Sequence, residues 1–130
     1  YFVGPIKDKW NYYFETDLTH CVYKPELLRL QYAGTASNKL MESIACGVPV
    51  LTSQNQDFKA LLEKCNFGVA VPQISSGEIA RAIKFLMDNQ SFYKERAENA
   101  KYAFETDLNY DYQFQRVLQE FEQIRLEQAA

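Results

Sequence analysis

The stretch from Gly34 to Thr52 constrains the fold of this chain more than any other part of the sequence. Apolar residues recur in it at spacings of three and four, which predicts one buried face of a short helix: Leu40, Met41, Ile44 and Ala45. Ser37 is placed to cap this helix, because its hydroxyl can accept a hydrogen bond from a free amide of the first turn. Gly47 is placed to end it, because glycine enters the left-handed region without steric cost. The branched, apolar run 48–52 that follows is typical of a strand buried on both faces.

Short strands alternate with helices along the whole chain. Besides 48–52, we expect strands near residues 1–3, 18–23 and 68–71. We expect helices over 9–15, 37–46, 58–64, from Ser75 or Ser76 to about 88, 89–105 and 112–127. This alternation predicts an α/β fold: a Rossmann-like parallel sheet of about four strands, flanked by helices and ending in long helices.

The helical patterns also predict which side chains are buried. Asp57 is expected to cap the helix at 58–64. The helix that follows Ser75 or Ser76 is expected to bury Ile79, Ile83, Phe85, Leu86 and Met87. In the next helix Arg96 belongs to a set of charges that resembles a solvated face. The last helix carries one apolar stripe, which stays exposed if its partner lies outside the chain: Phe114, Val117, Leu118, Phe121 and Ile124.

Composition limits the domain organisation and excludes several classes of function. The 130 residues, 47% of them apolar, suffice for one core and one domain. The net charge is −3 and the basic residues form no block, which argues against nucleic acid as a ligand. Three cysteines without a C-x-x-C pair indicate thiols in a reducing compartment, and with the lone His20 they predict no metal site. No apolar run approaches the roughly 20 residues that span a bilayer.

The start of the chain bears on how it is divided into domains. The chain opens on Tyr-Phe-Val without an initiating Met. We therefore expect residues 1–130 to form a single partial domain of a longer protein, and the sequence leaves open whether targeting signals lie upstream.

Glu42 marks a candidate binding site at the central helix. A helix N-terminus beside the end of a parallel strand is suited to an anion, because free amides point outward there and the helix dipole is positive. Glu42 lies one turn further along, where its carboxylate can accept two hydrogen bonds from a vicinal diol. This arrangement would suit a nucleoside diphosphate with its ribose. The same residues are also typical of a solvated helix glutamate behind an ordinary loop, so the pattern alone leaves both interpretations open.

The sequence of this stretch resembles a known signature. Residues 37–50, SNKLMESIACGVPV, are similar to the nucleotide-sugar-binding signature of the GT-B glycosyltransferases, in particular the group-1 or family-4-like retaining enzymes. The later order of strand, helix, FGVAVP, long helix, N-x-x-x-Y-x-x-x-x-x-N-A and last amphipathic helix is similar to the second half of that family's donor domain. The resemblance implies that Glu42 holds the ribose hydroxyls of the donor. It also implies that the diphosphate or sugar meets the segment formed by Gly34, Thr35, Ala36, Ser37, Asn38 and Lys39.

One position departs from the family pattern. Many members carry a second acidic residue eight positions before the glutamate, and here that position is Gly34. Contacts that this acid usually makes to the donor sugar therefore have no counterpart at position 34, and the identity of the sugar stays open.

The resemblance also implies an activity for the longer protein. It would transfer a sugar, as a hexosyltransferase does, from a UDP- or GDP-linked donor to an acceptor glycan or lipid-linked sugar held by a separate N-terminal domain. The usual products are surface polysaccharide or lipopolysaccharide, made in the cytoplasm or by peripheral association with the inner face of the membrane. No cofactor and no metal are expected. The catalytic residues are not assigned, and this polypeptide alone is expected to be inactive.

Two other classes of protein remain. An epimerase of GT-B fold acts on nucleotide-sugars, but it usually shows a serine- and glycine-rich turn with paired acids where this chain has Thr35-Ala-Ser37. A non-catalytic binding or interaction module of flavodoxin-like shape would not need Glu42 or the SNKL start. Nucleotide binding that depends on Glu42 would separate this module from the enzymes.

Overall fold

The computed structural model describes residues 8–24, 30, 32–72 and 74–129. In chain order its elements are α1 (Lys9–Phe14), β1 (Thr19–Cys21), α3 (Asn38–Ala45), β2 (Val50–Ser53), α4 (Gln56–Cys65), β3 (Gly68–Val71), α5 (Ser76–Asp88), α6 (Gln90–Ala103), the π-helical segment η1 (Phe104–Leu108) and α7 (Tyr110–Ala129). The expected α/β architecture, ending in long helices, is therefore confirmed.

The strands form one parallel sheet in the order β1-β2-β3. Val50 is in register with Thr19 on one side and with Gly68 on the other. Three of the four expected strands are thus present among the described residues, and the first of them is shorter than the expected 18–23. The strand expected at residues 1–3 lies outside the described ranges.

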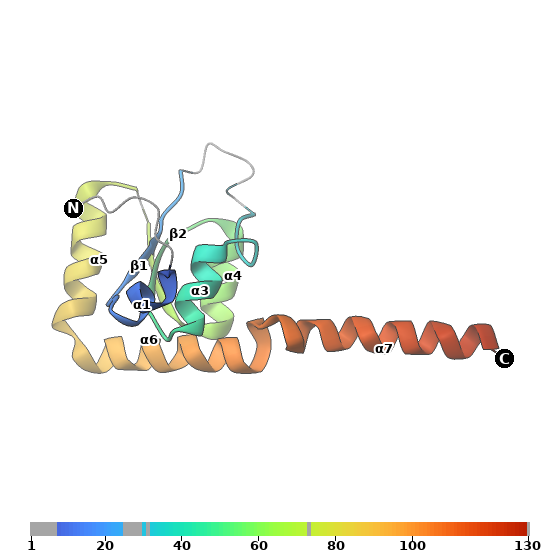
Figure 1. Ribbon diagram of the computed structural model, residues 1–130. Helices are drawn as coiled ribbons and strands as arrows, with labels where there is room; N and C mark the ends of the chain where they lie inside the picture. The colour runs from blue at the N-terminus through green and yellow to red at the C-terminus, as the bar shows by residue number, and fades with distance from the viewer. Residues whose placement is uncertain (1–7, 25–29, 31, 73, 130) are drawn as a thin grey trace.

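The described helices lie against the two faces and along the amino edge of this sheet (Figure 1). Both α3 and α4 stand on one side of the sheet, and α5 stands on the other side. A helix between two parallel strands runs antiparallel to them, so α3 and α4 begin at the carboxyl edge of the sheet. The opposite, amino edge is crossed by α6, where the backbone carbonyl of Ala97 would lie 3.5 Å from a Cβ at Gly47. The carboxyl edge is the side on which open α/β sheets bind ligands.

The core lies between the sheet and the α3–α4 layer. Its buried residues come from strands, helices and the link before β3: Cys21, Leu40, Ile44, Val50, Phe58, Phe67 and Ala100. Leu40 and Ile44 are two of the residues whose spacing predicted the buried face of α3. Burial of this face fixes the rotation of α3, and therefore fixes which of its polar residues face outward.

The ends of the helices follow the local rules with one exception. Ser37 Oγ accepts a hydrogen bond from the Leu40 amide at 3.3 Å, and Gly47 has a φ of 69°, as expected. Ser75, not Ser76, caps α5. The prediction that Asp57 caps α4 is wrong, because Asn55 Oδ1 accepts from the Phe58 amide at 2.8 Å and α4 begins one residue before Asp57.

Two burial predictions are also wrong. Ile83 and Phe85 are exposed, and only Leu86 of the expected α5 face is fully buried, because the three strands of the described residues do not cover the whole helix face. Arg96 is buried rather than solvated. Its guanidinium lies 4.1 Å from the centre of the Phe92 ring and donates to the Asn66 carbonyl at 3.1 Å.

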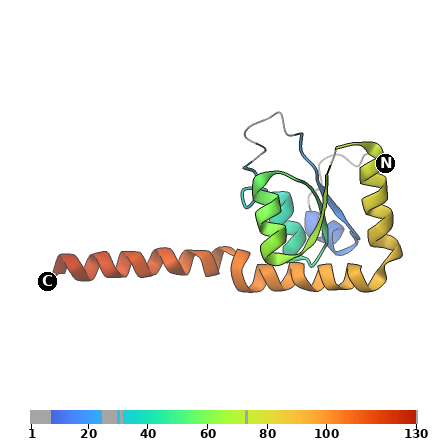
Figure 2. The same ribbon diagram turned by 180° about the vertical axis from the view of Figure 1, so that it is seen from behind.

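The C-terminal helix α7 extends away from the rest of the fold (Figure 2). The interruption expected between the helices at 89–105 and 112–127 is present as η1, after which Asn109 Oδ1 accepts from the Tyr112 amide at 2.8 Å. Every residue from 110 to 128 is exposed, and the predicted apolar stripe is between 36% exposed at Phe114 and 63% at Phe121. Within the described residues, no helix combines the length and the apolar character needed to cross a bilayer.

Candidate functional site

The start of α3 is held at the carboxyl edge by Tyr23, which follows β1. The Tyr23 amide donates to Ser53 Oγ at 3.2 Å, and its hydroxyl lies 3.3 Å from Ser37 Oγ. Its ring stacks on Phe58 with centroids 5.8 Å apart, and Lys39 Nζ lies 5.7 Å from the ring centre. Tyr23 therefore ties the ends of β1 and β2 to the N-terminus of α3. An aromatic residue at the end of an expected strand was the only sequence signal for this role.

The predicted donor residues in and after the loop before α3 differ in solvent exposure. Gly34 and Ser37 are buried, whereas Thr35, Ala36, Asn38 and Lys39 are exposed. Ser37 satisfies the Leu40 amide, while the amides of Asn38 and Lys39 belong to the first turn and have no acceptor within the helix. These two amides can therefore donate to an anion at the carboxyl edge.

Glu42 faces α1. Its Oε1 atom forms an ion pair with Lys9 Nζ, and its side chain is only 19% exposed, whereas that of Lys9 is 51% exposed. Burial raises the pKa of Tyr13 to about 12, and a hydrogen bond and the negative charge of Glu42 contribute to the same shift. The Glu42 carboxylate is thus paired with Lys9 of α1, lies close to Tyr13 and is not freely solvated.

Asp57 lies beside the predicted loop, although it was not among the residues predicted for the site. A Cβ placed on Gly34 would lie 2.6 Å from Asp57 Cβ and 3.0 Å from Asp57 Oδ2. The Asp57 side chain therefore occupies the space that a side chain at position 34 would take. With Thr35, Ala60 and Leu61 it lines a small cavity of about 260 Å³. The first turn of α4 thus places a carboxylate beside the predicted loop, and no sequence pattern indicated this contact.

A larger groove runs from the start of α3 to the C-terminal helices. Its volume is about 680 Å³, within the range of small-molecule sites. Of the predicted donor residues it contains Thr35 and Asn38, and its other lining residues are Met41, Leu61, Lys64, Phe104, Asp107, Leu108, Asn109, Tyr110 and Gln113. Glu42 does not line this groove. The structure therefore distributes the predicted residues around the N-terminus of α3 and does not gather them all in one cavity.

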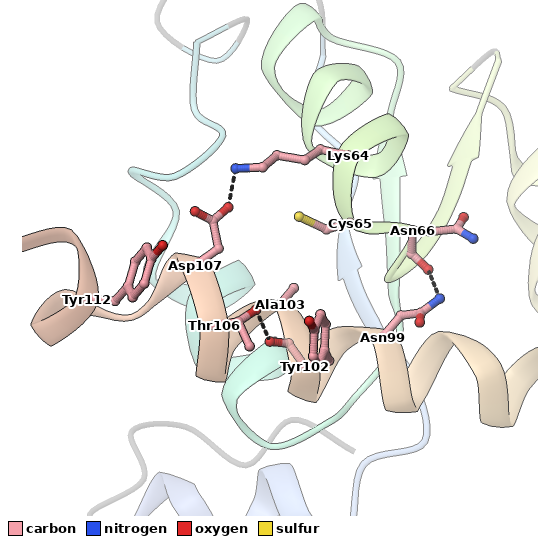
Figure 3. A pocket seen from close by; sticks show the side chains of 9 residues that line it. All are labelled: Lys64, Cys65, Asn66, Asn99, Tyr102, Ala103, Thr106, Asp107 and Tyr112. Atoms are coloured by element: carbon pink, nitrogen blue, oxygen red, sulfur yellow. Dashed lines mark hydrogen bonds and ion pairs between the residues drawn. The ribbon is translucent and has the colours of Figure 1, made fainter.

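A third cavity lies at the end of α4 (Figure 3). Its volume is about 410 Å³, and α6 and η1 form much of its wall. Lys64 pairs with Asp107 there, Asn99 donates to the Asn66 carbonyl at 3.3 Å, and burial raises the pKa of the Cys65 thiol. None of the predicted donor residues lines it. Two of its polar contacts, Lys64 with Asp107 and Asn66 with Asn99, join the end of α4 to η1 and α6.

The described part of the chain shows no grouping of three His, Cys, Asp or Glu side chains that could hold a metal ion. His20 is exposed on β1, and Cys21 beside it is buried with a pKa raised by burial. These two neighbours point to opposite faces of the sheet.

The comparisons with known proteins agree with this fold. A family model described as glycosyl transferase-like matches residues 3–119. Because the match covers most of the chain, this chain belongs to that glycosyl transferase-like family. The comparison with curated proteins and the comparison with solved structures give no significant match. Family membership confirms the resemblance that the residues 37–50 indicated.

Proposed function

We propose that this chain binds the nucleotide part of a nucleotide-sugar and forms the donor-binding part of a glycosyltransferase. The observation that carries the proposal is the position of Glu42. Its carboxylate is fixed one turn inside α3, whose first amides are available at the carboxyl edge of the sheet. Membership of the glycosyl transferase-like family supports a sugar-nucleotide ligand for such a site.

The spacing along α3 fits the two polar parts of a nucleotide. Glu42 lies four residues after Asn38, which is about 6 Å along the helix axis. A ribose whose hydroxyls donate to Glu42 would therefore place its diphosphate near the amides of Asn38 and Lys39. Glu42 would hold the ribose, and Ser37, Asn38 and Lys39 would meet the diphosphate or the sugar. Gly34, Thr35 and Ala36 would form the loop that borders them.

The same placement would assist sugar transfer. Negative charge grows on the diphosphate as the bond to the sugar breaks, and fixed amides aimed at this charge stabilise the transition state. The longer protein would transfer a hexose from a UDP- or GDP-linked donor to an acceptor glycan or lipid-linked sugar, bound by an N-terminal domain. We place this reaction in surface polysaccharide or lipopolysaccharide synthesis, in the cytoplasm or at the inner face of the membrane, without a metal or another cofactor.

Binding titrations test the proposal. UDP, GDP and their sugar conjugates are titrated against the chain, its Glu42→Ala variant and a Glu63→Ala control, since Glu63 makes an exposed ion pair with Lys59 in α4. We expect saturable binding that is lost with Glu42→Ala and kept with Glu63→Ala. Binding that survives Glu42→Ala would contradict the site. If the chain binds neither nucleotide, the titration is repeated on the longer protein, and absence of binding there too would refute the function.

A further expectation concerns activity. The described residues form one sheet and no second lobe that could hold an acceptor. We therefore propose that the chain alone does not transfer sugar. Turnover of any nucleotide-sugar by the purified chain would contradict this. Conversion of a nucleotide-sugar without an acceptor would instead favour the epimerase.

The exposed stripe of α7 favours a second candidate function, that of a non-catalytic interaction module. Such a module would present α7 to another protein and would not need Glu42. Under this alternative the chain binds no nucleotide, and Glu42→Ala changes nothing that can be measured by titration.

A further inference from the structure

We propose that Lys9 belongs to the same nucleotide site, where it compensates the charge of Glu42 and so allows a diphosphate to bind beside a carboxylate. This inference rests on the proposed function and adds to it a residue and an electrostatic role. No sequence pattern indicated Lys9. Only the fold brings the first residue of α1 to the second turn of α3.

A ribose-binding carboxylate next to a diphosphate raises an electrostatic problem. At neutral pH a nucleoside diphosphate carries at least two negative charges, and a bare Glu42 would add another close by. Two like unit charges about 6 Å apart weaken binding by about 3- to 10-fold in a partly solvated site. A cation in contact with Glu42 removes this penalty, while the carboxylate can still accept hydrogen bonds from hydroxyls.

Lys9 is positioned to be this cation. Its ammonium contacts Glu42 Oε1, and its side chain remains 51% exposed, so it can also face a ligand. The neighbouring Tyr13 contributes no charge at neutral pH, because its pKa is about 12. Two other charged side chains described near the N-terminus of α3 are Lys39 and Asp57, one of each sign. Removal of Lys9 therefore leaves the negative charge of Glu42 without its paired cation.

The test compares a nucleotide with its nucleoside. UDP and uridine, and GDP and guanosine, are titrated by ligand-observed NMR against the chain with Lys9, Lys9→Met and Lys9→Arg. We expect Lys9→Met to lower the affinity for the bound diphosphate about 3- to 10-fold and to leave nucleoside affinity unchanged or higher. Lys9→Arg keeps the charge and should keep the affinity. Lys59→Met is the matched control, since Lys59 makes an exposed pair with Glu63 at 3.9 Å, and it should change neither affinity.

Repeating the test in the Glu42→Gln variant shows whether Lys9 acts by compensating the charge of Glu42 or only by holding its side chain in position. In Glu42→Gln the carboxylate charge is gone, so adding Lys9→Met should no longer lower diphosphate affinity. Equal losses for the diphosphate and the nucleoside, or no loss for either, would overturn the inference while leaving the nucleotide site in place. If neither the chain nor the longer protein binds UDP or GDP, the proposed function fails and this inference fails with it. A thermal melt of each variant identifies any change caused by misfolding.

Discussion

The close packing of β3 against β2 predicts that a substitution at Gly68, the first residue of β3, destabilises the fold. Gly68 is in register with Val50 of β2, and a Cβ at this position would lie 2.0 Å from the Val50 carbonyl oxygen and 2.9 Å from its carbonyl carbon. Both atoms belong to the backbone of the central strand. Gly68→Ala therefore cannot be accommodated by rotation of a side chain, and the two strands must separate.

The cost follows from the size of this movement. A relaxed C···O contact is about 3.3 Å, so β3 must shift by about 1.3 Å relative to β2. Such a shift weakens the adjacent ladder hydrogen bonds, worth about 1 kcal/mol each, and adds an overpacking cost of about 1–3 kcal/mol. We expect Gly68→Ala to lose about 3 kcal/mol or more, a large part of the 5–15 kcal/mol typical of a domain.

Urea unfolding followed by circular dichroism measures this loss. With an m-value of about 1–3 kcal/mol/M, the midpoint should fall by about 1–3 M. Gly77→Ala is the matched control, because a Cβ at this second residue of α5 meets no atom within 4 Å. It should stabilise the chain by up to about 1 kcal/mol, since alanine restricts the unfolded state. If Gly68→Ala unfolds at the same urea concentration as the unaltered chain, the close approach of β3 to β2 is wrong.

Two further predictions concern the candidate site. Gly34→Ala should destabilise the chain by about 1–3 kcal/mol because its Cβ meets Asp57 Cβ. In thermal melts, the loss of stability in the double variant Gly34→Ala with Asp57→Gly should be smaller than the sum of the two single losses. Strict additivity of the losses would count against the contact. Tyr13 should ionise near pH 12, about two units above its ordinary value, so between pH 10 and 12 the unfolded chain ionises first and the contribution of Tyr13 to stability falls as the pH rises. The difference in absorbance at alkaline pH between the chain and Tyr13→Phe measures this ionisation, and Glu42→Gln should lower the pKa of Tyr13. Ionisation near pH 10 in the unaltered chain would show that the Tyr13 hydroxyl is not buried beside Glu42.

Local patterns were sufficient for most of the elements. The spacing of Leu40 and Ile44, with a capping Ser37 and a terminating Gly47, specified α3 and its buried face, because these signals act within a few residues. The same holds for β2 and β3, whose branched apolar residues are typical of a covered parallel sheet. The glycosyl transferase-like family could likewise be recognised from residues 37–50.

Side-chain environment could be predicted less well, because it depends on neighbours distant in the chain. Arg96 resembled a solvated charge, but the crossing of α6 below the sheet places it against Phe92 and the Asn66 carbonyl. Ile83 and Phe85 have a core-like spacing, but the described sheet is too narrow to cover them. Asn55 and Asp57 are both acceptable caps by residue type, and only the start of α4 decides between them.

The sequence by itself determined the order of strands and helices, the capped helix that begins at Asn38, the position of Glu42 on its polar side, and the family, because each of these depends on periodicity or on contiguous residues. Only the tertiary structure decided that Lys9 and Tyr13 surround Glu42, that Asp57 fills the space beside Gly34, and that Tyr23 ties the strand ends to α3. Each of these contacts joins residues separated by 14 or more positions, and their proximity follows from how the helices pack on the parallel sheet.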